Sequence, residues 1–171
     1  MGTKKNDTFA NFAAVRVAES AANTFTATKF AFPFSIMDKM ALIISRIEYW
    51  LQTPDSPNST ADTISMGISA SAVLADTSNQ ADPLIIDNMY MMRVDYGTAA
   101  NGTIYQAPYI KDFSNLVGGG LLVAPSPLYA WIVGSGTSKV NSAWFKLFYT
   151  YIELATDEYW QLVESRRIIS S

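Results

Sequence analysis

The clearest pattern along the chain is an alternation of apolar and polar residues with a period of two, which is the periodicity of a β-strand with one buried face. The alternation is strongest from Thr63 to Ala70, where Ile64, Met66 and Ile68 are separated by small polar residues or glycine. We therefore predict a strand in this segment, with its even-numbered side chains in a core.

Two further runs have the same period. From Leu84 to Tyr96 the even-numbered apolar residues are expected to face the core, which places Asp87 and Arg93 on the other face. From Ala143 to Leu154 both faces are apolar, and we expect the face that holds Trp144 to be the buried one. A strand with two apolar faces is typical of the centre of a sheet, or of a strand that also contacts another subunit.

Shorter apolar segments predict the remaining strands. They are Ala13 to Glu19, Thr24 to Phe34, Thr103 to Ile110, and Leu121 to Val133 with an interruption at Pro125-Ser126-Pro127. Proline cannot donate a hydrogen bond to a β-ladder, so the interruption indicates an edge, a bend or a bulge. The segment Ala41 to Leu51 also fits a helical stripe, but its β-branched and aromatic residues favour a strand, after one helical turn at Ser35 to Lys39.

One helix is expected at the C-terminal end, over residues 156–169. Thr156 can cap its first turn, and Asp157 and Glu158 suit the positive end of the helix dipole. A helix of this length is marginal in water by itself, so it must dock on another surface. We favour a neighbouring subunit over its own sandwich as that surface.

These elements predict a mainly β fold, an antiparallel β-sandwich of about eight strands with jelly-roll topology and a short C-terminal helix. The chain is expected to form a single domain over residues 1–171, with residues 1–8 as an N-terminal arm. No apolar run is long enough for a membrane-spanning helix and no signal peptide is evident, so we expect a soluble protein without a membrane partner.

The composition favours binding or assembly over catalysis. The chain has no cysteine and no histidine, so it lacks the thiolate nucleophile, the usual general base and the commonest metal ligands. We expect no enzyme activity, no catalytic residue, no resident metal and no cofactor, while calcium held between subunits by loop carboxylates stays open. Charged residues are only 16% of the chain, against about 25% in average soluble domains, which favours a large buried interface.

The aromatic residues near the C-terminus are the candidates for that interface. We expect self-association to involve Phe145, Tyr149, Tyr151, Tyr159 and Trp160. The candidate contacts for nucleic acid are Lys4 and Lys5 in the N-terminal arm. Because the net charge is −3 and affinity for phosphates grows with the number of basic contacts, direct binding to nucleic acid is expected to be weak or absent.

Three segments carry a resemblance to the single-jelly-roll coat proteins of small icosahedral viruses, particularly those known from environmental single-stranded DNA genomes. They are Ile44 to Trp50, Leu121 to Tyr129, and Trp144 to Leu154, in this order within a likeness that extends from Phe12 to Leu154. The resemblance implies a self-assembling capsid subunit, located in the virion, whose main partner is another copy of itself.

The chain departs from that family in one respect. Such coats commonly carry a long arginine- and lysine-rich N-terminal arm for genome packaging, whereas only Lys4 and Lys5 stand near the start of this chain. This departure puts genome binding in doubt. The alternative is a carbohydrate- or protein-binding β-sandwich module that uses exposed aromatic residues as its binding platform.

Overall fold

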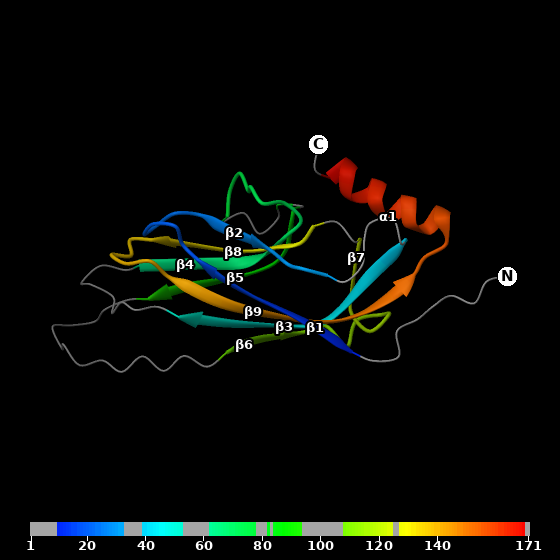
Figure 1. The fold of residues 1–171 in the computed structure, drawn as a ribbon, viewed down its shortest axis with the longest axis horizontal. Helices are drawn as coiled ribbons and strands as arrows, with labels where there is room; N and C mark the ends of the chain where they lie inside the picture. Colours follow the sequence, from blue (N-terminus) through cyan, green and yellow to red (C-terminus); the bar gives the residue numbers. More distant parts are fainter. Residues whose placement is uncertain are drawn as a thin grey trace.

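A computed structural model describes residues 10–32, 39–52, 62–77, 82, 84–93, 108–124 and 127–169. The described residues form nine strands and one helix, and the strands build two antiparallel sheets that pack face to face (Figure 1). The predicted mainly β sandwich with one C-terminal helix is confirmed. The N-terminal arm at 1–8 and the helical turn predicted at 35–39 lie wholly or mostly outside the described residues.

The first sheet, sheet A, has the order β1-β9-β3, and two short strands pair with successive parts of the other edge of β3. Its strands are β1 (Asn11–Ala18), β9 (Ser142–Glu153), β3 (Met40–Gln52), β6 (Tyr109–Asp112) and β7 (Leu121–Val123). The two longest strands pair along almost their whole length, which makes β3 and β9 the rigid centre of the sheet.

The second sheet, sheet B, has the order β2-β8-β4-β5. Its strands are β2 (Thr26–Lys29), β8 (Tyr129–Ser135), β4 (Asp62–Ser69) and β5 (Ile85–Arg93). Within the described part of the chain, β5 pairs only with β4, so it is the outermost strand of sheet B.

The strands pair as nested partners along the chain. The first strand pairs with the last, β2 pairs with β8, β3 pairs with β6 and β7, and β4 pairs with β5. This nesting, divided over two packed sheets, is the topology of a jelly roll. The segment predicted as one interrupted strand, Leu121 to Val133, is instead two strands in different sheets, with β7 in sheet A and β8 in sheet B.

The core lies between the sheets, and it corrects the expected orientation of β9. Phe145, Leu147 and Tyr149 are buried, whereas Trp144 is 45% exposed. The registers explain this, because Phe145 pairs with Val15 and Leu147 pairs with Ile47, two side chains that also pack in the core. The expectation that Trp144 faces the core is therefore wrong.

The orientation of β5 is also reversed relative to the prediction, but only after Ile86, which packs against the core as expected. Tyr90 and Met92 are exposed, while Met89 packs against the core. The pairing of β5 with β4 shifts by one residue near Ile68, and such a bulge moves every following side chain to the opposite face.

A tryptophan is buried on the outer face of sheet B. Trp131 has no exposed surface, although its neighbours Ala130 and Ile132 are the ones that point into the core. It lies against Gly67, where an added Cβ would come within 2.7 Å of the indole ring and 2.5 Å of the Asp87 carbonyl oxygen. Only glycine fits at position 67, because any side chain would displace the indole or the neighbouring strand.

The helix α1 (Thr156–Ile169) packs on the outer face of sheet A at the end where β3 begins and β9 ends (Figure 1). Ala41 of β3, Leu154 and Tyr159 form a small buried cluster there, with Leu162 and Val163 against it. The docking surface of the helix is thus its own sandwich, not the neighbouring subunit that the sequence analysis favoured.

Candidate functional site

The outer face of sheet A carries aromatic and charged side chains in rows that cross the strands. In one row Arg16 of β1 pairs with Trp144 of β9, which pairs with Trp50 of β3. Both indoles are nearly half exposed, at 45% for Trp144 and 46% for Trp50. Two large aromatic side chains therefore lie next to each other on the surface of the most extensively paired part of the fold.

A second aromatic row crosses the same face four positions further along each strand. Phe12 of β1 is 64% exposed and its ring lies 6.4 Å from that of Phe148 on β9. The guanidinium of Arg46 sits 4.0 Å from the centre of the Phe148 ring, and the Lys146 ammonium lies 4.7 Å from both phenylalanine rings. These cation–π contacts hold the long basic side chains against the sheet.

A cavity of about 490 Å³ opens beside the tryptophan pair. Its lining residues are Ala14, Glu48, Trp50, Leu51, Gln52, Trp144, Phe145 and Lys146. Glu48 lies in it as a paired carboxylate, since Arg46 approaches one of its oxygens at 3.1 Å. The cavity combines flat apolar walls with a few polar groups, as small-molecule sites generally do.

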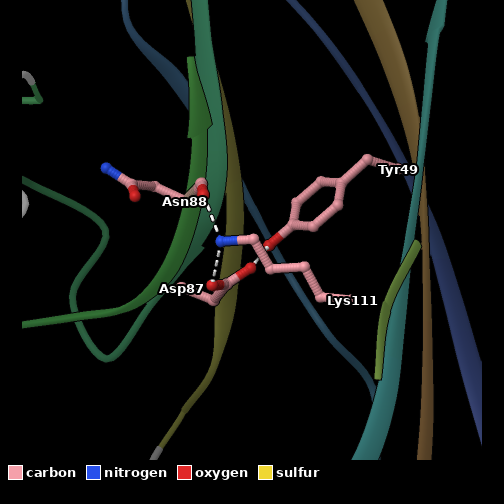
Figure 2. Close-up of polar contacts among 4 residues, drawn as sticks. All are labelled: Tyr49, Asp87, Asn88 and Lys111. Carbon is pink, nitrogen blue, oxygen red and sulfur yellow. Dashed lines mark hydrogen bonds and ion pairs between the residues drawn. The ribbon is translucent and has the colours of Figure 1, made fainter. Parts of the chain in front are cut away.

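A polar cluster lies between the two sheets, on the side where β5 and β6 are outermost (Figure 2). Lys111 of β6 donates to Asp87 of β5 at 2.5 Å and to the Asn88 carbonyl oxygen at 2.7 Å. The hydroxyl of Tyr49, on β3, donates to the other oxygen of Asp87. Three strands from both sheets are thereby joined through one carboxylate.

The protonation of this cluster fits a structural link. Burial, followed by the nearby Asp87 charge, raises the pKa of Tyr49 well above its usual value of 10.0. The phenol therefore stays neutral and acts as a hydrogen-bond donor at physiological pH. Because Asp87 already accepts hydrogen bonds from both Tyr49 and Lys111, its charge is compensated within the sandwich.

A buried carboxylate closes one end of the sandwich. Glu19, which follows β1, accepts hydrogen bonds from the Gly134 amide at 2.6 Å, from the Asn141 amide at 2.7 Å and from the Asn141 side chain at 2.8 Å. Asn23, held at a positive φ of 61°, bonds both backbone groups of Thr137. These contacts bind the turn after β1 to the turn between β8 and β9.

The five residues that the sequence analysis assigned to an interface differ in how far they are exposed. Phe145, Tyr149 and Tyr159 are buried within the chain itself, so they are not available to a partner, which corrects their assignment. The physical reason is that Phe145 and Tyr149 occupy the inner face of β9, and Tyr159 is covered by the docking of its helix. Tyr151 is partly buried against the core, and Trp160 is 55% exposed.

The remaining predictions concern nucleic-acid contacts, metals and the membrane. Lys4 and Lys5 lie outside the described residues. Among the residues that the structure describes, no group of three acidic side chains is placed to hold a metal ion. No helix in this part of the chain is both long and apolar enough to cross a membrane.

The sequence analysis missed the aromatic and basic residues that make up the outer face of sheet A, above all Phe12, Arg46 and Lys146. Phe12 and Arg46 lie in different strands that touch only through β9. Alternation within each strand was the one available signal, since Phe12, Ala14 and Arg16 share a face. Strand pairing was needed to bring them together.

Comparison of the chain with models of known protein families gave no match, and neither did comparison with curated protein sequences. The structure defines the class of fold, an antiparallel β-sandwich of two sheets, and the function has to be argued from its surfaces.

Proposed function

We propose that the chain is a self-assembling structural protein, the coat subunit of a small icosahedral virus. Two observations support the proposal together, the nested jelly-roll order of the strands and the resemblance in the segments Ile44 to Trp50, Leu121 to Tyr129 and Trp144 to Leu154. A jelly roll serves many functions, so the proposal depends on a surface that suits contact between copies.

The observation that carries the proposal is the apolar side of the sandwich formed by its outermost strands β5 and β6. Tyr90 and Met92 of β5 are 53% and 62% exposed, and Tyr109 and Ile110 of β6 are 47% and 51% exposed. In the described part of the chain these strands are the outermost ones of their sheets, and an exposed strand edge with apolar side chains is a ready template for contact with another chain. The Lys111–Asp87 link keeps the two strands together as one surface.

A shell subunit needs heterologous contacts that close by rotation, in which this side of one copy meets a different surface of the next. Exposed apolar residues elsewhere offer such a second surface, including Leu116 and Val117 in the segment between β6 and β7. A specific contact of standard size buries about 800 Å² on each partner, so several of these side chains would be covered at once.

Electron microscopy of the purified protein at high concentration, together with sedimentation velocity, tests the proposal. We expect closed particles of uniform size. Tyr90→Lys and Met92→Lys place a charge on the β5 edge and should shift the protein to monomers while its circular dichroism spectrum stays that of a β protein. A matched control is Val73→Lys, at a residue that is 74% exposed in the segment after β4, which should still assemble.

A monomer at every concentration and salt condition would overturn the proposal. Equal loss of assembly in the Val73 control would overturn the assignment of the contact to the β5 edge. A monomer that nevertheless binds oligosaccharides would favour the alternative class, a binding module.

A further inference from the structure

The Trp50–Trp144 pair has polar side chains on both sides along the strands. Towards one end, the next outward positions are Gln52 and Ser142, which are themselves register partners. Towards the other end, the next outward positions are Glu48 and Lys146, also partners. Alternate residues of a strand are about 7 Å apart. Hydrogen-bonding groups therefore lie at a short, fixed distance from the two indoles on both sides along the strands.

The polar groups on the first side are already ordered by one another. Ser142 donates from its hydroxyl to the Gln52 side-chain oxygen at 3.5 Å, and Arg16 donates to the same hydroxyl at 3.3 Å. The Gln52 side-chain oxygen accepts from Ser142, and its NH₂ group, which has two donor hydrogens, can donate to a ligand in the cavity. The sheet thus presents both donors and acceptors around an aromatic surface.

The charge of the cavity indicates what kind of ligand it suits. Its lining contains one carboxylate, Glu48, and one ammonium, Lys146, so their formal charges cancel. The Arg46 guanidinium that approaches Glu48 lies against the Phe148 ring, and Arg16 is on the rim beside Trp144. Both guanidinium groups lie outside the lining and are engaged, Arg46 with Glu48 and the Phe148 ring, and Arg16 with Ser142. The lining itself therefore offers paired donors and acceptors, which suit a neutral polyol, and not the surplus of cations that a phosphate backbone needs.

We propose that this cavity binds a saccharide. One face of a pyranose ring is lined by C–H groups that can pack on the exposed indoles of Trp50 and Trp144. Its ring hydroxyls would then meet Gln52 on one side and Glu48 with Lys146 on the other. A volume of about 490 Å³ lies in the range of small-ligand sites, roughly 300–1,000 Å³, and admits a short oligosaccharide.

This site is independent of the proposed shell contact, because it lies on the outer face of sheet A and not on the β5 edge. The test begins with an array of immobilised oligosaccharides probed with the labelled full chain, followed by calorimetric titration of the strongest one. We expect binding to at least one oligosaccharide. Trp50→Ala and Trp144→Ala should each weaken it at least tenfold, and both should fold, since the indoles are only half buried.

Trp160→Ala is the matched control, an exposed aromatic on helix α1 outside the cavity. It should leave the affinity within twofold of the wild type, whereas an equal loss in this variant would overturn the assignment of the site. Failure of the wild type to bind any saccharide on the array would overturn the proposal. So would tight binding of a single-stranded oligothymidine without saccharide binding, which would identify the face as a nucleic-acid surface. Sedimentation of each variant separates these results from a failure of assembly.

Discussion

Tyr49 and Asp87 lie 38 positions apart in the sequence, yet the hydroxyl of Tyr49 on β3 donates a hydrogen bond to the carboxylate of Asp87 on β5. The contact joins sheet A to sheet B, and Lys111 completes it from β6 (Figure 2). A partly buried carboxylate that is hydrogen-bonded and ion-paired, as Asp87 is, stabilises the fold only while all its partners remain.

Replacement of Tyr49 by phenylalanine should lower the free energy of unfolding by about 1.5–3 kcal/mol, the usual value for a hydrogen bond to a charged group. Urea unfolding followed by tryptophan fluorescence measures the change. Tyr90→Phe is the control, because Tyr90 lies on the same strand as Asp87 but is exposed, and it should change stability by less than about 0.5 kcal/mol. Equal midpoints for the two variants would show that the Tyr49 hydroxyl contributes nothing.

Stability should also fall in alkaline solution. The pKa of Tyr49 is raised above 10.0 in the folded chain by burial and by Asp87, so above pH 10 the unfolded chain loses a proton that the folded chain keeps. Folding is then disfavoured by up to about 1.4 kcal/mol for each further pH unit, until the folded pKa is reached. Unfolding free energies measured from pH 8 to 11 should fall more steeply for the wild type than for Tyr49→Phe. Parallel curves would contradict this assignment.

Two tryptophans should respond very differently to truncation. Trp131→Ala empties a fully buried site and should cost about 3–5 kcal/mol. Trp144→Ala removes an indole that is 45% exposed on the outer face of sheet A and should cost less than about 1 kcal/mol. Thermal unfolding of both variants provides the comparison, with each as the control for the other. A larger loss for Trp144 would mean that β9 is turned over.

Glu19→Gln should destabilise the end of the sandwich by about 2–3 kcal/mol. The Gly134 and Asn141 amides donate to different oxygens of the Glu19 carboxylate, and a glutamine side chain has only one oxygen to accept them. Hydrogen exchange should speed up first at the Gly134 and Asn141 amides, which donate to this carboxylate. Glu153→Gln, at an exposed residue on the last strand, controls for the loss of one negative charge. Unchanged exchange at both amides would show that the Glu19 carboxylate does not hold the turn.

Local periodicity was sufficient to predict where most of the strands lie. The runs at Thr63 to Ala70 and Ala143 to Leu154 became β4 and β9 with nearly the same bounds, because alternation and β-branched or aromatic residues are properties of short segments. The C-terminal helix was readable for a similar reason, since its capping and charged residues act within one or two turns.

Which face of a strand points inward was decided only by the tertiary structure. Both faces of β9 are apolar, so the alternation could not indicate whether Trp144 or Phe145 is buried, and the pairing with β1 and β3 made that choice. In β5 one bulged position near Ile68 reversed the side chains and turned Asp87 towards Tyr49. Because side chains alternate with a period of two, a one-residue bulge exchanges the inner and outer faces, and the alternation before the bulge no longer predicts which face is buried after it.

The residues that come together in the candidate sites could likewise not be predicted from the sequence. Trp50 and Trp144 became neighbours only because β9, the last strand, pairs with β3, and residues so far apart leave no local signal of their contact. What the sequence determined by itself is the set of strands, the helix and the preference for a sandwich, since these follow from short-range periodicity. The tertiary structure alone decided the strand order, the buried face of each strand and the side chains that share a surface, because these depend on register between distant segments.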